Sequence, residues 1–424
     1  MSAPLRILIA TDSFPPVCGG SGWSTWELSR GLIKRGHHVE VVKVDASGRR
    51  GIFETTYDGI RVSEFCRPAS NVPVVRNLQK NERLWPALEK YLRTRLRESA
   101  FDLVHGQHAM TTVPSINAAA EANLPAVATV RDYWPVCYWS DLIYDPSQAA
   151  LCPECTAGMM TKCVKPRAGA ATPAAWTLIP YMRLNLQTKR RTLARASAVI
   201  APSHAIAADL RARAPELSET PLYTIPNPVD MAPLDDIHDH SPRPKADPYV
   251  LYAGKLARNK GVQFLLGAYQ DAAIPWPLVV AGDGPMRAEF EAEARERGIN
   301  VEILGWLPRE QTLIWMRHAG MLAFPSYGPE SLSRVLIEAS ALGTPIAAMD
   351  TGGTRDIVHH GTTGLLSADP TAFSRDLARL FTDERLRVAL GSRARVEAHA
   401  AFSAESVVER IEQVYRSVLE PRAA

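Results

Sequence analysis

The sequence lacks the features that would place the chain across a membrane or on a nucleic acid. Its 424 residues contain no apolar run long enough to cross a bilayer. The formal net charge is only +3, which is too small to indicate a nucleic-acid partner. The opening residues, MSAPLRILIA, are too short for the hydrophobic region of a secretory signal. We therefore expect a cytoplasmic protein with no nucleic acid among its partners.

A dinucleotide fingerprint and an internal repeat are also missing. The Gly-rich segment 11–22 contains no G-x-G-x-x-G, so a bound dinucleotide is not indicated. What the chain does have is 46% hydrophobic residues, enough for the cores of two globular domains of ordinary size.

Short apolar runs alternate with amphipathic stretches, and this order predicts parallel sheets covered by helices. The expected strands are 6–10, 38–44, 101–105, 126–130, 197–201, 249–253, 277–281, 301–304, 321–324 and 345–349. Residues 231–248 are rich in Pro, Asp and His without periodicity, which predicts an interdomain linker. The expected fold class is α/β, with two Rossmann-like doubly wound domains facing a cleft.

Residues 321–343 carry a pair of glutamates in a distinctive setting. They predict a strand, a turn containing Pro and Gly, and a helix that ends at Gly343. Glu330 and Glu338 bracket the helix start, with seven residues between them. Eight steps along a helix rise roughly 12 Å. That is about the reach needed to touch a transferred sugar at one end and a nucleotide ribose at the other.

This spacing resembles the E-x7-E signature of retaining glycosyltransferases of the GT-B fold, close to family 4. The resemblance implies that Glu330 contacts the transferred sugar and Glu338 the ribose. The backbone amides of Ser331, Leu332 and Ser333 are expected in the first helical turn, where they would hold the diphosphate. The alternative is a surface helix with two unrelated glutamates.

A second motif supports the same resemblance. The segment from Gly254 to Gly261, GKLARNKG, resembles the family's G-R-L-x-x-x-K-G motif, whose two cations grip the donor diphosphate. Lys260 matches the motif, and Lys255 replaces the usual arginine, which keeps the charge but loses the bidentate fork. Cations and helix amides stabilise a leaving diphosphate without a metal, so no cofactor is expected at the sugar site.

Two further segments resemble family motifs with departures. Pro16, Gly19 and Gly20 match the P-x-x-G-G turn, although the glycines could equally serve a tight bend. The segment 102–108, DLVHGQH, resembles D-x-x-H-x-H, whose second His approaches the transferred sugar. Gln107 stands at that position and His108 follows one residue late. The sequence leaves open which of the two faces the sugar.

The segment 131–132 departs from the family as well. Many relatives carry His-Asp there, whereas this chain has Arg131 before Asp132. We count Asp132 among the expected substrate-binding residues.

Four of the cysteines cluster in an insertion at 137–163. Cys152 and Cys155 form a C-x2-C knuckle, and Cys137 and Cys163 flank it. Four thiols in this spacing suit a tetrahedral structural zinc. Disulfides and plain thiols are the alternatives.

The stretch 177–196 is expected to be helical with a basic face. Its cations are Arg183, Lys189, Arg190, Arg191 and Arg195. A solvated face is the ordinary interpretation, and peripheral contact with an anionic membrane is the alternative, which would put the protein at the inner face of the membrane.

The resemblance spans most of the chain and implies the domain plan of a GT-B enzyme. We expect an acceptor-side domain at 1–226, a linker at 227–248, a donor-binding domain at 249–395 and a C-terminal segment, 396–424, that crosses back to the first domain. The implied function is transfer of a sugar from a nucleotide diphosphate-sugar to an acceptor hydroxyl, with retained configuration. The acceptor class stays open between a glycan, a lipid-linked molecule and a small molecule.

Two rival functions are compatible with the same sequence. One is a GT-B nucleotide-sugar epimerase, and the other is a nucleotide-sugar-binding protein without catalytic activity. Function depends on site residues and not on the fold.

Overall fold

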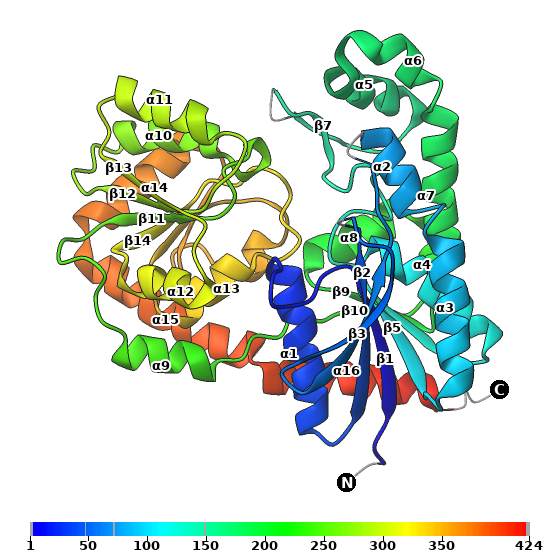
Figure 1. The fold of residues 1–424 in the computed structure, drawn as a ribbon. Helices are drawn as coiled ribbons and strands as arrows, with labels where there is room; N and C mark the ends of the chain where they lie inside the picture. Colours follow the sequence, from blue (N-terminus) through cyan, green and yellow to red (C-terminus); the bar gives the residue numbers. More distant parts are fainter. Residues whose placement is uncertain (1–2, 47, 71–72, 148–149, 421–424) are drawn as a thin grey trace. The chain divides into compact units, whose positions relative to one another are not determined.

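The computed structural model describes residues 3–46, 48–70, 73–147 and 150–420. The chain divides into two compact units (Figure 1). The first unit comprises Met1–Ser140, Leu178–Pro228 and Ala404–Ala424, and the second comprises Asp141–Thr177 and Val229–Ser403. Residues 148–149 of the expected cysteine insertion and 421–424 of the expected C-terminal segment lie outside the described residues.

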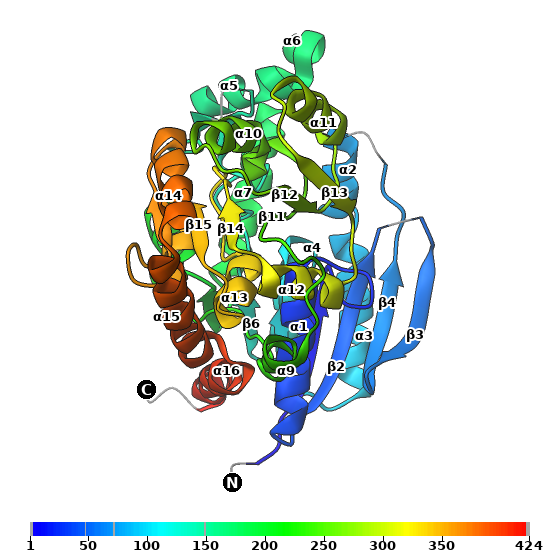
Figure 2. The same ribbon diagram turned by 90° about the vertical axis from the view of Figure 1, so that its left-hand side faces the viewer.

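The described part of the first unit is built on an eight-stranded sheet in the order β10-β9-β6-β5-β1-β2-β4-β3. Only the pairing of β3 with β4 is antiparallel, and β3 forms an edge of the sheet beside β4 (Figure 2). The strands are β1 Arg6–Thr11, β2 His38–Asp45, β3 Gly51–Tyr57, β4 Ile60–Cys66, β5 Leu103–Gly106, β6 Ala126–Thr129, β9 Ala198–Ala201 and β10 Leu222–Thr224.

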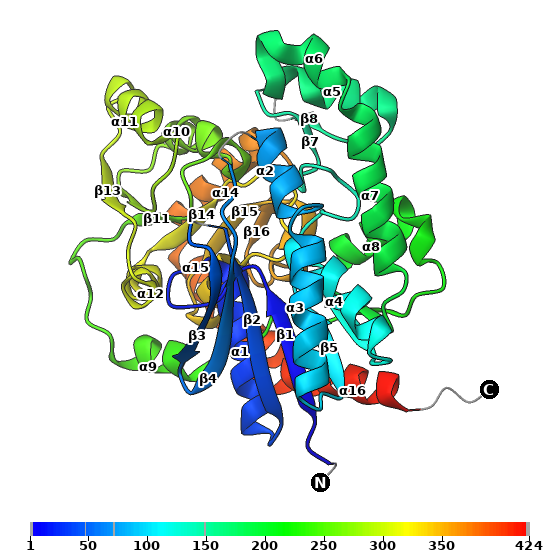
Figure 3. The same cartoon turned by 45° about the vertical axis from the view of Figure 1, so that its right-hand side comes forward.

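Helices cover both faces of this sheet because its inner strands are apolar on both sides. The helices are α1 Gly20–Lys34, α2 Pro73–Lys80, α3 Trp85–Glu98, α4 Ala109–Glu121, α7 Ile179–Leu193, α8 His204–Arg213, the short 3-10 turn η2 Pro215–Leu217, and α16 Ala404–Leu419. Ile7 and Ile9 of β1 pack in one cluster with side chains of α1 and α16. Helices α3 and α4 lie side by side (Figure 3), and Arg93 donates to both carboxylate oxygens of Glu121 across them.

The second unit carries a parallel six-stranded sheet in the order β13-β12-β11-β14-β15-β16, together with a short hairpin formed by β7 and β8. These counts refer to its described residues. The strands are β7 Ile143–Asp145, β8 Ala150–Leu151, β11 Val250–Ala253, β12 Leu278–Ala281, β13 Val301–Gly305, β14 Met321–Phe324, β15 Ile346–Met349 and β16 Leu365–Ser367.

Alternate side chains of β11 enter two separate cores on the two faces of this sheet. Leu251 packs with α9, α12 and α13, whereas Val250 packs with α10, α11 and α14 (Figure 2). The helices are α5 Ala157–Ala168, η1 Gly169–Ala171, α6 Thr172–Trp176, α9 Ala232–His240, η3 Arg258–Lys260, α10 Val262–Asp271, α11 Arg287–Glu296, α12 Arg309–His318, α13 Arg334–Ala341, η4 Gly352–Asp356, α14 Pro370–Thr382 and α15 Glu384–Phe402. The predicted fold class, two Rossmann-like α/β domains, is confirmed.

The structure differs from the sequence-based expectation at several boundaries. Helix α9 occupies the expected linker, because the buried Leu234 and Ile237 recur three residues apart and give it one apolar face. Residues 141–163 of the cysteine insertion, together with the residues that follow as far as 177, belong to the second unit and not to the first. Helix α15 continues to Phe402, so the C-terminal segment that joins the first unit is α16 alone.

The expected basic face of α7 is also smaller than predicted. Lys189 is buried, and the guanidinium of Arg190 donates to the carbonyl of Pro135. Arg183 and Arg191 remain exposed on this helix, and Arg195 is exposed two residues after the helix ends. Within the described residues, none of the helices has the length and apolar character needed to span a membrane.

Candidate functional site

The turn between β14 and α13 in the second unit is held by close backbone contacts. Gly261 has a φ of +72°, and a Cβ there would lie 1.8 Å from the carbonyl oxygen of Pro325. Gly352 has a φ of +50°, and a Cβ there would lie 2.2 Å from the carbonyl oxygen of Glu330. The amide of Gly353 donates to that same carbonyl at 2.7 Å. Only glycine fits at positions 261 and 352, and the backbone of Glu330 is thereby fixed.

The side chain of Glu330 takes part in a three-residue cluster. Its Oε1 accepts hydrogen bonds from Nζ of Lys260 and from Oγ of Ser326, each at 2.6 Å. Glu330 is largely buried, with 11% of its side chain exposed, whereas Lys260 keeps 33%. The predicted sugar contact and the predicted diphosphate cation are therefore bonded to one another, with the lysine on the solvent side.

The loop after β11 carries the second predicted cation. The backbones of Gly254 and Gly282 pack closely, because a Cβ at Gly282 would lie 1.9 Å from the Gly254 carbonyl oxygen. The hydroxyl of Tyr252 donates to the carbonyl of Lys255 at 2.8 Å, which fixes the turn. Burial and the nearby Glu330 charge raise the pKa of Tyr252, so the phenol stays neutral. The side chain of Lys255 is exposed and available to a ligand.

Glu338 is enclosed by two arginines that the sequence did not single out. Its Oε1 accepts from Nη2 of Arg309 at 2.9 Å and from Nε of Arg334 at 2.8 Å. Burial would raise the pKa of this carboxyl, but the two guanidinium charges outweigh it and hold the pKa below its usual range. Glu338 is therefore an ionised acceptor with a fixed orientation.

The predicted helix start needs correction. Helix α13 begins at Arg334 with Ser333 as its N-cap, so Ser331 and Leu332 lie in the turn before the helix. The amides of Ser331, Leu332 and Ser333 are therefore not first-turn amides of α13. The prediction started the helix directly after Glu330, whereas the backbone enters the helix three residues later, with Ser333 in an extended conformation.

In the first unit, the predicted residues gather where β1, β5 and β6 end. Oε1 of Gln107 accepts from Nη2 of Arg131 at 2.6 Å, and Nη1 of Arg131 donates to Oδ1 of Asn227. The side-chain nitrogen Nε2 of Gln107 lies 3.0 Å from Nε2 of His105. Nδ1 of His105 lies 2.6 Å from the hydroxyl of Tyr415 in α16. Gln107, Arg131 and His105 are thus occupied by one another and by neighbouring elements.

His108, by contrast, keeps one ring nitrogen without a hydrogen-bond partner in the described part of the chain. Its Nδ1 accepts from the amide of Asp12 at 3.4 Å and lies 3.1 Å from Oγ1 of Thr11. Nε2 is buried with no hydrogen-bond partner among the described residues. Burial, with a contribution from the charge of Arg131, lowers the pKa of His108 to about 3. The ring is therefore neutral, and the acceptor role of Nδ1 toward the Asp12 amide assigns the ring proton to Nε2.

Buried charges surround the same strand ends. Burial raises the pKa of Asp132 to about 6 and that of Asp12 to about 7. Burial lowers the pKa of Lys189 to about 8, with the charge of Asp132 acting against the shift. Asp132 accepts from the amide of Trp134 at 2.8 Å. Asp132 is therefore placed by its own loop, close to a lysine that the sequence pattern assigned to a solvated face.

The glycines of the first turn have unequal roles. Gly19 is the N-cap of α1, and Gly20 is its first residue. A Cβ at Gly19 would meet nothing within 4 Å, whereas one at Gly22 would lie 2.6 Å from Cβ of Cys18. The close-packed position is Gly22, which the family turn does not include.

In the part of the chain that the structure describes, the four clustered cysteines are not grouped as a metal site. Cys137 lies in the first unit, and the other three lie in the second. The thiol of Cys152 donates to the carbonyl of Glu154 at 2.8 Å, and that of Cys163 to the carbonyl of Met160 at 3.4 Å. Among the described residues, no group of three or more His, Cys, Asp or Glu side chains is placed to hold a metal ion. The zinc prediction gains no support from this arrangement.

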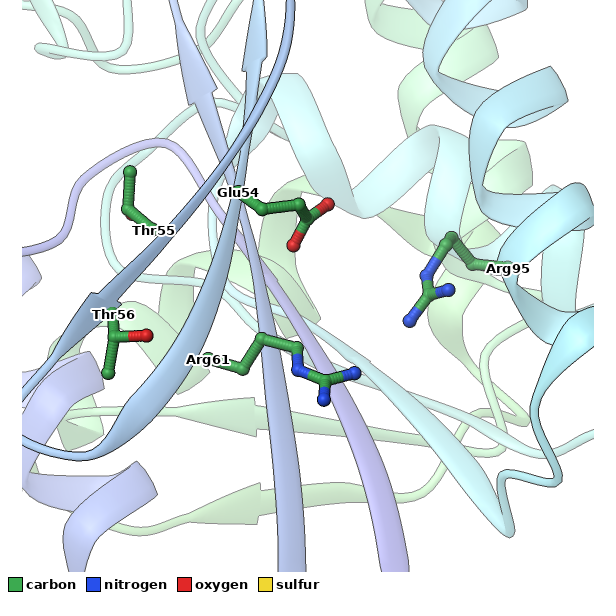
Figure 4. A pocket seen from close by; sticks show the side chains of 5 residues that line it. All are labelled: Glu54, Thr55, Thr56, Arg61 and Arg95. Atoms are coloured by element: carbon green, nitrogen blue, oxygen red, sulfur yellow. The ribbon is translucent and has the colours of Figure 1, made fainter.

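A pocket elsewhere in the first unit has different chemistry. It has a volume of about 620 Å³ and is lined by Glu54, Thr55, Thr56, Arg61 and Arg95 (Figure 4). Arg95 donates to Glu40 at 2.6 Å, and Glu54 accepts from Ser63 at 3.0 Å. These charged groups are already paired within the protein, and none of the predicted site residues lines the pocket.

Two family models match the chain. The model described as Glycosyltransferase Family 4 matches residues 18–232, just over half of the 424 residues. The model described as Glycosyl transferases group 1 matches residues 235–397.

Individual proteins are similar at lower identity. The D-inositol 3-phosphate glycosyltransferase of Xylanimonas cellulosilytica is 26% identical over 431 residues, covering 96% of this chain and 93% of that protein. The alpha-D-kanosaminyltransferase of Streptomyces kanamyceticus is 28% identical over 180 residues, covering 40% of this chain and 46% of that protein.

Solved structures share the fold. Sucrose-phosphate synthase from Thermosynechococcus elongatus matches with a TM-score of 0.72 at 21% identity, covering 98% of this chain and 99% of that one. Anabaena HepE in complex with UDP-glucose matches with a TM-score of 0.64 at 18% identity, covering 97% and 100%.

Proposed function

Because this chain belongs to glycosyltransferase family 4, it is a retaining transferase that moves a sugar from a nucleotide-sugar donor to an acceptor, and we propose that the cluster of Lys260, Glu330 and Ser326 binds the donor at its reacting end. The transferase prediction is confirmed by the family match. Members of this family typically need no cofactor. The predicted zinc takes no part in the proposed function.

The observation that carries the proposal is the sharing of one carboxylate oxygen. Oε1 of Glu330 is bound by both Lys260 and Ser326, each at 2.6 Å. An ammonium has three donors, so Lys260 can bind a diphosphate oxygen while it holds Glu330. The lysine then stabilises negative charge on the leaving diphosphate, and the glutamate faces the sugar on which positive charge builds.

Lys255 and Glu338 complete the proposed donor site. The exposed ammonium of Lys255 supplies a second positive charge to the diphosphate as a point charge without a fork. Glu338 accepts hydrogen bonds from the ribose hydroxyls, with its orientation set by Arg309 and Arg334. The depressed pKa of Glu338 keeps the carboxylate ionised for this role.

In the first unit we assign the substrate contact to His108 and not to Gln107. Both polar ends of Gln107 are taken up by Arg131 and His105. Nε2 of His108 is a donor without a protein partner among the described residues. Asp132, with its pKa raised to about 6, is a second candidate for contact with an acceptor hydroxyl.

An activity screen with a panel of donors and acceptors tests which of them the protein uses. Purified protein is incubated with nucleotide diphosphate-sugars of different bases and sugars, and release of nucleoside diphosphate is measured with and without acceptors. Inositol phosphates and UDP-sugars come first, because similar proteins are named for the former or solved with the latter. Release that requires an acceptor supports the proposal, and its loss in Lys260→Ala and Glu330→Gln supports the site. Full activity in both variants would contradict the assignment.

A further inference from the structure

The cysteine region folds onto the turn that carries Glu330. Both segments belong to the second unit. A Cβ added at Gly328 would lie 3.5 Å from Cδ1 of Ile143 in β7 and 3.0 Å from the carbonyl oxygen of Asn259. The hydroxyl of Tyr327 donates to the carbonyl of Pro146, just after β7, at 3.4 Å. The hairpin therefore abuts the turn two and three residues before Glu330.

The same turn is fixed on its other side by the body of the unit. Thr351 donates to the carbonyl of Tyr327 at 3.1 Å, and the amide of Gly328 donates to the carbonyl of Asn259 at 3.1 Å. The ring of Tyr327 meets that of Phe264 edge-on, with centroids 5.8 Å apart. The turn thus lies between these residues of the second unit and the hairpin. We infer that the hairpin limits the outward movement of the turn.

One arginine holds the hairpin in this place. Nη2 of Arg167 donates to the carbonyl of Ile143 at 2.7 Å and to Oδ2 of Asp141 at 2.8 Å. Its Nη1 donates to the carbonyls of Tyr144 at 3.3 Å and Cys163 at 3.0 Å. Arg167 is largely buried, with 17% of its side chain exposed. A single guanidinium therefore fixes β7 to α5 through several bonds in one plane.

From these contacts we propose that Arg167 is a positioning residue for the transfer reaction, acting through β7 and the Tyr327–Gly328 turn on Glu330. This inference rests on the proposed role of Glu330. A displacement of the turn by a fraction of an ångström separates the carboxylate from the reacting sugar, and catalysis is sensitive to misplacement on that scale. The hydrogen bonds of Arg167 described above go to β7, Asp141 and α5, whereas Lys255 and Lys260 of the diphosphate grip lie on the β11 loop and in η3.

The inference predicts a division between rate and affinity in Arg167→Ala. Turnover at saturating substrates should fall about 10-fold or more, while calorimetric affinity for the nucleoside diphosphate stays within about 3-fold. Arg167→Lys should recover part of the rate. The matched control is Arg387→Ala in the same unit, where the guanidinium also donates to two backbone carbonyls, those of Leu380 and Phe381. That variant should keep its turnover, since these carbonyls belong to α14, away from the turn.

A double-mutant comparison separates this inference from the proposed function. If Arg167 acts through Glu330, then Arg167→Ala should cost little more in a Glu330→Gln background, because the two effects share one pathway. Independent, multiplying losses would overturn the inference, as would full turnover in folded Arg167→Ala. Full turnover in Glu330→Gln alone would instead overturn the proposed function.

A second variant covers the case in which Arg167→Ala does not fold. Tyr327→Phe removes only the hydroxyl that meets Pro146 and keeps the ring against Phe264. Its turnover should fall by about 2- to 5-fold with unchanged nucleoside diphosphate affinity, as expected for one weak hydrogen bond. Unchanged turnover in this variant would contradict the proposed coupling between hairpin and turn.

Discussion

Nζ of Lys260 lies 2.6 Å from Oε1 of Glu330 in a salt bridge that joins η3 to the turn before α13. The pair joins an ammonium and a carboxylate, for which we propose opposite roles in the reaction of the donor. In the proposed site, Lys260 would face a leaving group that gains negative charge, and Glu330 would face a sugar carbon that gains positive charge. The charges on the leaving diphosphate and on the sugar carbon both develop in the transition state. Lys260 and Glu330 interact with different ones, so their replacement should affect the rate in different ways.

Replacement of Lys260 by alanine should weaken donor binding. A charge-assisted contact is worth roughly 1.5–3 kcal/mol, so affinity for the nucleoside diphosphate should fall about 10- to 100-fold. Calorimetry measures this directly. The control is Lys245→Ala, which breaks a salt bridge of similar length to Glu302, 2.5 Å, away from the predicted site residues. Unchanged affinity in Lys260→Ala would mean that the phosphate lies elsewhere.

Lys255→Arg should be tolerated at the same site. The substitution restores the cation that is usual in the family motif, and a guanidinium can contact two phosphate oxygens at once. We expect nucleoside diphosphate affinity equal to that of the parent protein or several-fold tighter. Calorimetry under the conditions used for Lys260→Ala provides the comparison, and a marked loss of affinity would place Lys255 outside the diphosphate site.

Glu330→Gln should lower turnover more than affinity. The substitution keeps the shape and the hydrogen-bond acceptor but removes the negative charge that opposes the developing positive charge on the sugar. Turnover at saturating donor and acceptor should fall about 10- to 100-fold, with a smaller change in nucleoside diphosphate affinity, because that product has no sugar to contact. Steady-state kinetics with calorimetry on the same preparation is the measurement.

Glu338→Gln should cost both affinity and stability. The donor and the nucleoside diphosphate share the ribose, so both should bind more weakly by similar factors. Arg309 and Arg334 would lose the carboxylate that they share, and breaking a buried ion pair from one side costs about 3–5 kcal/mol, less where an acceptor oxygen remains. The melting temperature should therefore fall in this variant and change little in Glu330→Gln. Equal melting temperatures in the two variants would contradict this account.

The pH dependence of stability should reveal the buried carboxyl of Asp12. Its pKa is raised from 3.8 to about 7 by burial, so the folded state binds more protons than the unfolded state between these values. This group therefore adds stability as the pH falls from about 7 to about 4. His105 and His108 act in the opposite direction, since burial lowers their pKa from 6.5 to about 3 and the unfolded state binds the extra protons.

Asp12→Asn should expose the histidine contribution. Relative to the parent protein, the free energy of unfolding of this variant should fall by up to about 1.4 kcal/mol for each unit by which the pH is lowered from about 7 to about 4. Chemical denaturation at several pH values measures the difference. Parallel curves for the two proteins would show that Asp12 is ionised in the folded state.

The sequence by itself determined the positions of ten strands and the motifs of the site, but it did not predict β3, β4, β7, β8, β10 and β16. Apolar runs such as 249–253 and 321–324 fall within a residue or so of the observed strands, because burial on both faces leaves a run with no polar position. The E-x7-E spacing and the motif around Lys260 are local patterns, so the order of residues alone is enough to recognise them. They also sufficed to predict the family and the reaction class, which the family match confirmed.

Only the tertiary structure decided which partners these residues have. The contact between His105 and Tyr415 spans 310 residues, and no local pattern relates positions so far apart. Arg131 fits no family motif, yet in the fold it donates hydrogen bonds to Gln107 and to Asn227. Asn227 lies 96 residues after Arg131 in the chain. Lys189 was predicted on a solvated face because helical periodicity indicates which residues share a face, but not what packs against it. Partners of this kind are set by packing between elements, and that packing is not encoded in any one segment.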